Sequence, residues 1–384
     1  MIELKNLYKS YRGKSVLMNI SLTIQDNEFF VLIGSSGCGK TTLLKTLNKL
    51  NPIDKGEILI NGTPINRIKV TQLPRLMGYV VQEGGLFPHM TVEDNIALAM
   101  RVAGYPKEKI YDRITELLEL VNLEPDQYRS QYPSQLSGGQ RQRIGVARAF
   151  AADPEIILMD EPFSALDPMT RAELQDEVHQ LQLRFHKTIV FVTHDMDEAV
   201  KLADRICILQ NGHVVQCDKP ENILKHPANE YINSFIGKNR LWENPSFIRA
   251  EDIMRPRPIT ISQSRTVVQA VQLMRHYNID SLLVTGDDNK FAGMVWLQDL
   301  IGIDQYSSPV SSFLSDDYLS VRVDDSLSTV LEKVADYGEK DFGILPVLDA
   351  EGAIRGFLNR SSLLSTLSRR FIDEPVERDE QEGA

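Results

Sequence analysis

The sequence predicts an α/β protein in two parts: a nucleotide-binding domain with a phosphate-binding loop, followed by a smaller α/β module made of two similar halves. Three observations lead to this fold class. A glycine-rich loop stands between an apolar strand and a helical run, a second glycine-rich segment opens a later helix, and five elements recur in the same order after about residue 250. The length of 384 residues accommodates two or three domains.

Composition and charge exclude several classes of protein. The net charge of −11 argues against bulk nucleic-acid binding, so we expect no nucleic-acid partner. No apolar run approaches the roughly 20 residues that cross a bilayer, and the alternating start Ile2-Glu3-Leu4 lacks the features of a signal peptide. The cysteines have no metal-ligand spacing and fit a reducing compartment. We therefore expect a peripheral protein that serves a membrane from its cytoplasmic face, through partners.

The first motif is a phosphate-binding loop. Residues 34–41 read Gly-Ser-Ser-Gly-Cys-Gly-Lys-Thr, between an apolar strand at 29–33 and a helical run at 42–50. Glycines let the backbone amides face phosphates, and the helix N-terminus adds positive potential. We expect Lys40 to reach the β- and γ-phosphates of ATP and the Thr41 hydroxyl to ligate Mg²⁺. The predicted ATP-binding residues of this loop are Gly34, Ser35, Ser36, Gly37, Cys38, Gly39, Lys40, Thr41 and Thr42.

Two acidic residues supply the second half of the site. The apolar strand at 156–159 ends in Asp160 and Glu161, at the edge where α/β sheets hold their ligands. Asp160 is expected to bind Mg²⁺ directly or through water. Glu161 is expected to polarise the attacking water as a general base.

A second glycine-rich helix start is the decisive segment. Leu136-Ser137-Gly138-Gly139-Gln140 precedes a helix at 141–152 and forms a second anion site. Phosphate-loop enzymes in general do not need such a site. It makes sense if it covers the γ-phosphate of a nucleotide held by another copy of the chain.

With these motifs, residues 1 to about 235 resemble the ABC ATPase family, whose signature is LSGGQ. The resemblance implies that Tyr11 stacks on adenine. It also implies that Gln82 senses Mg²⁺ and the attacking water, and that His194 contacts the γ-phosphate. The implied catalytic residues are thus Lys40, Gln82, Glu161 and His194, and the implied Mg²⁺ site comprises Thr41, Gln82 and Asp160.

The same resemblance implies a homodimer that closes head to tail on two ATP molecules. The loop from Ser164 to Asp167 would cross the dimer interface, and closure would complete the electrostatic cage around each triphosphate. Motion would then pass to transmembrane permease subunits through residues 83–90, where Leu86 and Phe87 are apolar and suited to seat a cytoplasmic helix.

The second part of the chain resembles a tandem pair of CBS domains. Its two copies lie about 60 residues apart. Each has a strand (259–261 or 319–321), a helix (266–277 or 326–337), a strand (281–285 or 344–348), a second strand and a final helix. The predicted boundaries are an ATPase domain at 1–237, a linker at 238–250, CBS copies at 251–305 and 309–370, and a disordered acidic tail at 371–384.

An importer ATPase followed by a CBS pair resembles the osmoprotectant uptake family, whose substrates include glycine betaine, carnitine and choline. The implied partners include a substrate-binding protein, reached through the permease. Because the permease and binding protein select the solute, this chain does not specify it.

The CBS pair is expected to regulate transport, and cyclic di-AMP is one hypothesis for its ligand. The Thr/Ser-x-x-Asp pattern of many CBS pockets is replaced by Trp296 with Asp299 and by Asn359 with Ser362, so the ordinary AMP or ATP mode is not expected. Alternatives are a dimerisation or spacing module and an ionic-strength sensor. The residues expected to hold cyclic di-AMP are Phe342, Ile344, Leu345, Arg355 and Arg360.

The sequence disfavours three other functions. Soluble ABC ATPases of DNA repair or translation have coiled insertions or two cassettes, and exporters commonly fuse membrane helices to the cassette; neither feature occurs in this sequence. A non-enzymatic nucleotide-sensing scaffold is disfavoured because Lys40, Asp160, Glu161 and His194 are all present.

Overall fold

The structure, a computed structural model, describes residues 1–82, 85–237, 240–286, 288–303, 306–315, 317–338 and 342–368. The chain divides into two compact units, residues 1–236 and 237–384. The predicted acidic tail at 371–384 lies outside the described residues, as do Lys238 and Asn239 of the predicted linker and Glu83 and Gly84 of the predicted docking segment. Among the described residues, no helix is long and apolar enough to cross a membrane.

A six-stranded sheet forms the centre of the first unit, in the order β10-β9-β3-β8-β7-β6. All neighbours pair in parallel except β10 with β9. Strands buried on both faces are expected to be continuously apolar, and β3, β7 and β8 have no exposed residue. The strands are β3 (Phe29–Ile33), β6 (Met77–Val80), β7 (Ile156–Asp160), β8 (Thr188–Thr193), β9 (Arg205–Gln210) and β10 (His213–Asp218).

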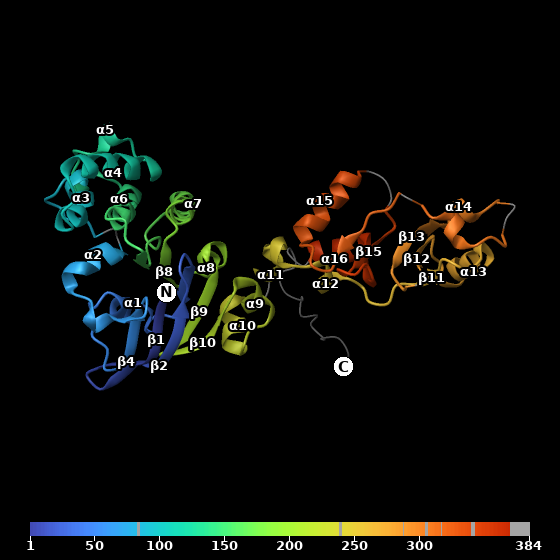
Figure 1. Cartoon of the computed structure of the whole chain (residues 1–384), viewed down its shortest axis with the longest axis horizontal. Helices are drawn as coiled ribbons and strands as arrows, with labels where there is room; N and C mark the ends of the chain where they lie inside the picture. The colour runs from blue at the N-terminus through green and yellow to red at the C-terminus, as the bar shows by residue number, and fades with distance from the viewer. Residues whose placement is uncertain are drawn as a thin grey trace, which may run out of the picture. The chain divides into compact units, whose positions relative to one another are not determined.

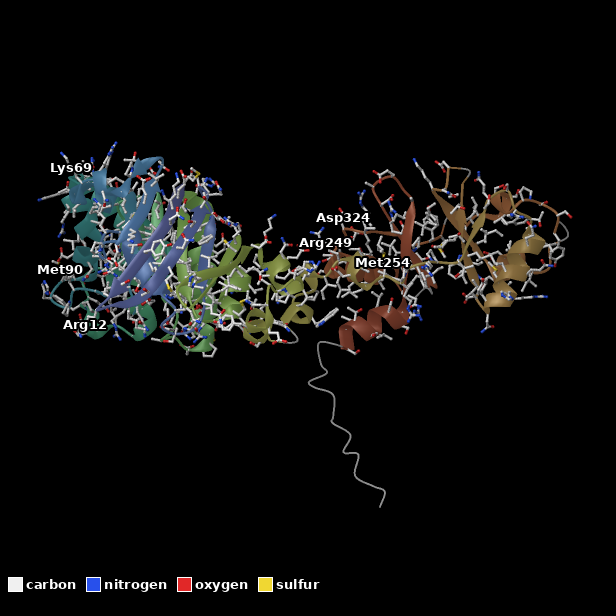
Figure 2. The ribbon with its side chains drawn as sticks, turned by 90° about the horizontal axis from the view of Figure 1, so that it is seen from below. Arg12, Lys69, Met90, Arg249, Met254 and Asp324 are labelled. Atoms are coloured by element: carbon white, nitrogen blue, oxygen red, sulfur yellow. The ribbon has the colours of Figure 1, made fainter. Side chains whose placement is uncertain are left out.

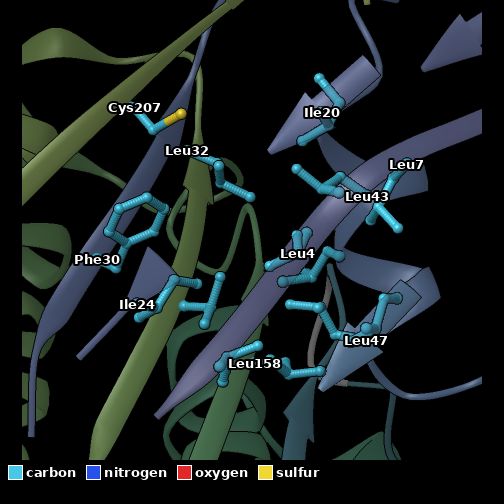
Figure 3. Packing of buried hydrophobic residues seen from close by; sticks show 14 of the residues in the cluster. Leu4, Leu7, Ile20, Ile24, Phe30, Leu32, Leu43, Leu47, Leu158 and Cys207 are labelled. Atoms are coloured by element: carbon cyan, nitrogen blue, oxygen red, sulfur yellow. The ribbon is translucent and has the colours of Figure 1, made fainter. Parts of the chain in front are cut away.

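A second, antiparallel sheet covers one face of this unit in the order β2-β1-β4-β5. Figure 3 shows side chains from both sheets and from helix α1 (Lys40–Leu47) pointing toward one another, among them Leu4, Ile20, Phe30 and Leu43. Full burial of each such side chain contributes about 1.5–3 kcal/mol. This core fixes the start of α1 beneath the glycine-rich loop. The strands are β1 (Ile2–Tyr11), β2 (Lys14–Ile24), β4 (Lys55–Ile60) and β5 (Thr63–Pro64).

One group of helices in the first unit stands apart from the strands. Helices α3 to α6 gather at one end of the unit, beyond the strands (Figure 1). Helix α7 is capped by Asp167 at its N-terminus and by His186 at its C-terminus, where the His186 backbone is left-handed (φ 49°). The remaining bounds are α2 (Leu73–Leu76), α3 (Val92–Val102), α4 (Lys107–Leu120), α5 (Pro125–Tyr128), α6 (Gly138–Phe150), α7 (Pro168–Phe185), α8 (Met196–Leu202), α9 (Pro220–Lys225) and α10 (Glu230–Ile236).

The second unit contains two three-stranded sheets of identical topology. In each, the first strand pairs in parallel with the second, and the second pairs antiparallel with the third. The sheets are β11 (Thr260–Ser262), β12 (Ser281–Thr285) and β13 (Phe291–Trp296), then β14 (Val321–Arg322), β15 (Ile344–Leu348) and β16 (Ile354–Asn359). The α/β fold class predicted from the sequence is confirmed in both units.

Helices complete the two halves of this unit. Long amphipathic helices follow the first strand of each half, at α13 (Val267–Tyr277) and α15 (Leu327–Tyr337), in register with the predicted helices. The other helices are α11 (Arg240–Glu243), α12 (Ala250–Ile253), α14 (Leu297–Leu300) and α16 (Arg360–Ser368).

One segment of this unit lies against the half to which it is not adjacent in sequence. Arg249 forms a β-bridge with Ser326, and the N–H of Arg255 donates to the Phe357 carbonyl (2.9 Å). Gly356 lies so close to Met254 that an added Cβ would be 2.7 Å from its sulfur. Arg249 and Met254 (Figure 2) therefore belong by contact to the second half, although they precede the first half in the chain.

Candidate active site

The glycine-rich loop is shaped by positions that only glycine fills well. Gly34 (φ 154°) and Gly39 (φ 109°) have positive φ, and a Cβ at Gly34 would lie 2.2 Å from the Leu209 carbonyl oxygen. A Cβ at Gly39 would lie 2.8 Å from a methyl of Leu17 and 2.9 Å from the carbonyl oxygen of Val16. The loop is thus wedged between β9 and β2, which fixes the path of its backbone.

Lys40 opens α1 directly after this loop and is almost fully buried. Its Nζ donates to the Gly34 carbonyl (2.7 Å) and the Ser35 carbonyl (3.2 Å). The ammonium group is therefore held over the loop. The pocket there has a volume of about 180 Å³, and its described lining residues are Val16, Ser36, Gly37, Gly39, Lys40, Thr41, Thr42 and Glu161.

Cys38 serves packing within the loop. The side chain is 4% exposed, and burial raises the pKa of its thiol despite the charge of Lys40 nearby. A buried, protonated thiol is a poor nucleophile, so Cys38 acts as a small apolar residue of the loop.

Thr41 and Asp160 form the candidate metal site. The Thr41 hydroxyl donates to Oδ1 of Asp160 (2.8 Å), and Asp160 is 7% exposed. The Tyr79 hydroxyl donates to Oδ2 of Asp160 (3.5 Å), and burial together with that carboxylate raises the pKa of Tyr79. A hydroxyl and a carboxylate oxygen are donors that Mg²⁺ prefers beside phosphate oxygens, so these residues fit the ion.

Glu161 and His194 come together from the ends of adjacent strands β7 and β8. His194 Nδ1 lies 3.1 Å from Glu161 Oε2. The Glu161 backbone is left-handed (φ 48°), which non-glycine residues adopt rarely, and its N–H donates to the Val192 carbonyl (3.0 Å). The sharp turn after β7 is thereby anchored to β8. The Glu161 carboxylate is partly exposed at the pocket, while 61% of the His194 side chain is exposed.

Gln82 and Ser164 extend this cluster. Gln82 Nε2 donates to Ser164 Oγ (3.4 Å), and Ser164 Oγ donates to the Glu161 carbonyl (3.1 Å). Four predicted residues, Gln82, Glu161, Ser164 and His194, therefore lie in one connected group at the carboxyl edge of the sheet, where α/β folds place their ligands.

The signature turn lies elsewhere on the chain. Ser137 is the N-cap of α6: its Oγ accepts from the Gln140 N–H (3.2 Å), and Gln140 Oε1 accepts from the Ser137 N–H (2.9 Å). Ser137 and Gly138 are exposed. None of the described residues that line the nucleotide pocket comes from this turn, so within one chain it does not reach the phosphate loop.

Two further predicted residues sit at the margins. Tyr11 ends β1 with its ring 42% exposed, and Lys9 Nζ lies 5.1 Å from the ring centroid. Asp167 caps α7 by accepting from the Thr170 N–H (3.1 Å), and hydrogen bonds to Thr170 hold the pKa of its carboxyl below the usual range. Neither residue is among the described lining of the pocket.

Sequence reasoning missed Arg171, which joins the Ser164–Asp167 loop to the segment around His194. Its Nη2 donates to the Leu166 carbonyl (3.1 Å), and its guanidinium lies 3.7 Å from Asp195 and 4.0 Å from Glu198. Glu198 is buried and accepts from the Thr193 hydroxyl (2.6 Å), and burial raises its pKa. The only signal in the sequence was the group of acidic residues at the start of α8. It did not indicate that Arg171 is their partner.

Fold and site together define an ATP-binding cassette, a dimerising class of ATPase. The ABC transporter family model matches residues 17–164, and the CBS domain model matches residues 250–304 and 310–369. The dimeric structure of a bacterial ABC transporter cassette has a TM-score of 0.53 and is 34% identical, covering 57% of this chain and 99% of that chain. A dimeric post-hydrolysis cassette bound to ADP and Pi matches at 33% identity, with a TM-score of 0.53 and coverage of 57% and 99%.

Curated relatives match along nearly the whole length. The choline transport ATP-binding protein OpuBA of Bacillus subtilis is 44% identical over 95% of both chains. The glycine betaine/carnitine/choline transport ATP-binding protein OpuCA of the same organism is 45% identical over 95% of both. The osmoprotectant import ATP-binding protein OsmV of Salmonella typhimurium is 36% identical over 96% of both. The chain belongs to this family of ABC transporter ATP-binding subunits with a C-terminal CBS pair, and it is an ATPase.

Proposed function

We propose that this chain energises an importer for quaternary-ammonium osmoprotectants of the betaine, carnitine and choline type. The observation that carries the solute class is the full-length match, CBS pair included, to relatives named for these solutes. The chain acts as a homodimer at the cytoplasmic face of a membrane, bound to permease subunits. A substrate-binding protein delivers the solute through the permease.

The chain's own groups provide the hydrolytic chemistry. Glu161 accepts a proton from the water that attacks the γ-phosphate, and His194, whose Nδ1 lies 3.1 Å from Glu161 Oε2, orients that carboxylate. Lys40 places a positive charge beside the phosphates that the loop amides hold. Thr41 and Asp160 would hold Mg²⁺, with Gln82 as a further proposed ligand, and the ion would supply charge that offsets the triphosphate.

The partner copy completes the cage. In a single chain the Ser137–Gly139 turn, which is exposed at Ser137 and Gly138, is not among the described residues that line the pocket. A helix N-terminus with free amides binds anions readily, so a second chain's turn is suited to cover the γ-phosphate. Hydrolysis then cleaves the γ-phosphate that the turn covers. When the released phosphate leaves, the turn has no anion to hold and the dimer reopens.

An apolar cleft beside the active site is suited to receive the permease. It has a volume of about 460 Å³ between β6, α2, α3 and α6, and its described lining includes Leu73, Met77, Val81, Phe87 and Leu98. Tyr79 lines this cleft and also donates to Asp160. A cytoplasmic helix seated there would therefore touch a direct neighbour of the candidate metal site.

The rim of this cleft is preorganised. Asn95 is fully buried; it accepts from the Phe87 N–H (2.7 Å) and donates to the carbonyls of Phe87, Met90 and Thr91. Arg148 donates to the Gly85 carbonyl (2.8 Å). These bonds hold Phe87 41% exposed at the rim, and Met90 marks the loop in Figure 2. A loop fixed before binding loses less entropy when the partner docks.

The CBS pair regulates the ATPase in this proposal. Of the residues predicted for cyclic di-AMP, Leu345 and Phe342 are buried in the core of the second half, and Arg360 lies over the Phe342 ring at 5.4 Å. Ile344 is partly buried in β15, and Arg355 is bonded to Asp349 (2.8 Å). Cyclic di-AMP as the ligand of this pair remains a hypothesis. Calorimetric titration of the full chain with this dinucleotide tests it, because binding would release heat.

Uptake by a reconstituted transporter tests the proposed function. The chain is combined with its permease and binding-protein subunits in proteoliposomes loaded with ATP, and uptake of labelled choline, glycine betaine and carnitine is measured. We expect ATP-dependent uptake of at least one of these solutes, abolished by Glu161→Gln. ATP turnover without uptake of any of the three would refute the solute class and leave the ATPase assignment intact.

A further inference from the structure

The second unit contains a cleft of about 490 Å³ between its two halves. This volume lies in the range of about 300–1,000 Å³ that is typical of small-molecule sites. Four of its described lining residues come from the first half, two from the chain between α14 and β14, and one from the end of α15. The described lining residues are Asp280, Trp296, Gln298, Asp299, Ser315, Asp317 and Tyr337.

Two aromatic side chains form apolar walls of this cleft. Trp296 ends β13 and is partly exposed. Its indole is wedged against Gly343 of the second half, where an added Cβ would lie 2.8 Å from the ring. Tyr337 is also partly exposed, and its hydroxyl donates to Oδ1 of Asp317 (3.0 Å). Both rings are held in place by contacts to other elements.

The charge of the cleft has one sign. Asp280, Asp299 and Asp317 are exposed carboxylates, and none of the described lining residues is basic. An anionic ligand such as a nucleotide phosphate is repelled by this arrangement. Among the described residues, no group of three or more acidic, histidine or cysteine side chains is arranged to hold a metal ion. The three carboxylates therefore do not form a metal-binding group of that kind, and the aromatic rings beside them favour an organic cation.

We propose that this cleft binds a quaternary ammonium ion. Such a cation has no N–H to donate and is recognised by aromatic faces, with carboxylates supplying long-range attraction. The choice of a quaternary ammonium ion among organic cations rests on the proposed function, because it is the solute class assigned to the transporter. The residues of the cleft belong to the second unit, whereas those of the ATPase site belong to the first.

The position of the cleft gives the ligand a means to act. Trp296 and Asp299 belong to the first half, whereas Tyr337 belongs to the second. A cation that contacts both walls favours the arrangement of the halves in which they face one another, and it shifts the population toward that arrangement.

Direct titration of the purified full chain tests this proposal. The chain has two tryptophans, and Trp242→Phe leaves Trp296 as the only one, so its fluorescence reports on the cleft. The probes are choline, tetramethylammonium and 3,3-dimethylbutan-1-ol, an uncharged analogue of choline. We expect saturable changes with the two cations and at least tenfold weaker binding of the neutral analogue.

Variants locate the site. Asp299→Asn and Tyr337→Leu are each expected to weaken choline binding at least tenfold, whereas Asp324→Asn, a carboxylate of the same unit outside the cleft, leaves it unchanged. Calorimetry of choline binding to Trp296→Leu tests the contribution of the Trp296 ring. An unchanged melting curve of this variant excludes unfolding. No saturable binding, equal binding of the neutral analogue, or variants without effect would overturn the proposal.

The binding assay needs no transporter, so the two proposals fail separately. Choline binding without choline-type uptake would count against the proposed solute, and uptake without binding would count against the cleft.

Discussion

Glu161 Oε2 lies 3.1 Å from His194 Nδ1, although 33 residues separate them. The contact arises because β7 and β8 are parallel neighbours in the sheet, so the residues that follow them emerge at the same edge. His194 is mostly exposed while Glu161 lines the pocket. The pair thus combines a fixed base with an imidazole that remains accessible to the nucleotide.

Glu161→Gln should lower ATP turnover at least a hundredfold, because the amide cannot accept the proton of the attacking water. ATP should still bind, and an ATP-bound dimer should accumulate on gel filtration. Phosphate release measures turnover. Glu155→Gln, just before the other end of β7, is the matched control and should retain activity. Turnover near the wild-type rate in Glu161→Gln would exclude it as the base.

Thr41→Val keeps the shape of the side chain but removes the hydroxyl that donates to Asp160. We expect the Mg²⁺ concentration for half-maximal ATPase activity to rise at least tenfold, whereas Thr41→Ser restores it. The measurement is ATPase rate against Mg²⁺ at fixed ATP. An unchanged Mg²⁺ requirement in Thr41→Val would remove Thr41 from the metal site.

Arg171→Met breaks the link between the Leu166 carbonyl and the carboxylates of Asp195 and Glu198. Because the phosphate loop is untouched, we expect kcat to fall about tenfold or more with little change in KM for ATP. Arg184→Met, on the exposed end of the same helix, is the control. A rise in KM at constant kcat would show that Arg171 does not act through the segment that carries His194, Asp195 and Glu198.

Phe87→Ser removes an exposed apolar side chain from the rim of the proposed docking cleft. The basal ATPase rate of the isolated chain should stay the same, because Phe87 is not among the described residues that line the nucleotide pocket. Co-purification with the permease should be lost. Val70→Ser, which is 70% exposed outside the cleft, should co-purify normally. Full assembly of Phe87→Ser would argue against this docking site.

Asp349→Asn should make the second unit's stability less dependent on pH. Asp349 accepts from the Ala353 N–H (2.8 Å) and from Arg355 Nε (2.8 Å), which hold its pKa below 3.8. A depressed pKa stabilises the fold above the unfolded value of 3.8, and this contribution is lost as the pH falls through the lower folded value.

The variant should therefore melt below wild type at pH 7, with the difference shrinking under acid conditions below about pH 4. Tryptophan fluorescence follows this unit alone, because Trp242 and Trp296 both belong to it. Glu351→Gln, exposed on the same turn, serves as control. A melting difference that persists undiminished at acid pH would contradict the assignment.

The sequence predicted the elements of the site whose signals are local. The strand–loop–helix around Lys40 (residues 29–47) and the acid pair at the end of β7 (residues 156–161) each lie in one short continuous stretch, so their patterns are visible directly. Helix α15 likewise begins one residue after the predicted start at Ser326. Short-range periodicity and capping determine these elements.

Relationships that depend on strand order could not be predicted. Arg171 meets Asp195 and Glu198 because α7 and α8 pack together, and no spacing in the chain records that contact. The strand predicted at 319–321 is instead Val321–Arg322, because pairing with Val347 and Leu348 of β15 sets its position. The cleft at Trp296 depends on both halves and was likewise invisible.

The contacts of α12 with the second half have a consequence for engineering this chain. Arg255 pairs with Phe357, and the Ala250 N–H donates to the Asp325 carbonyl (2.9 Å). A chain cut after residue 305 would strip these backbone groups of their partners and expose Ile248 and Ala250, both now buried with the second half. The segment that leads into the first half thus packs against the second half, and a usable truncation has to remove both halves or neither.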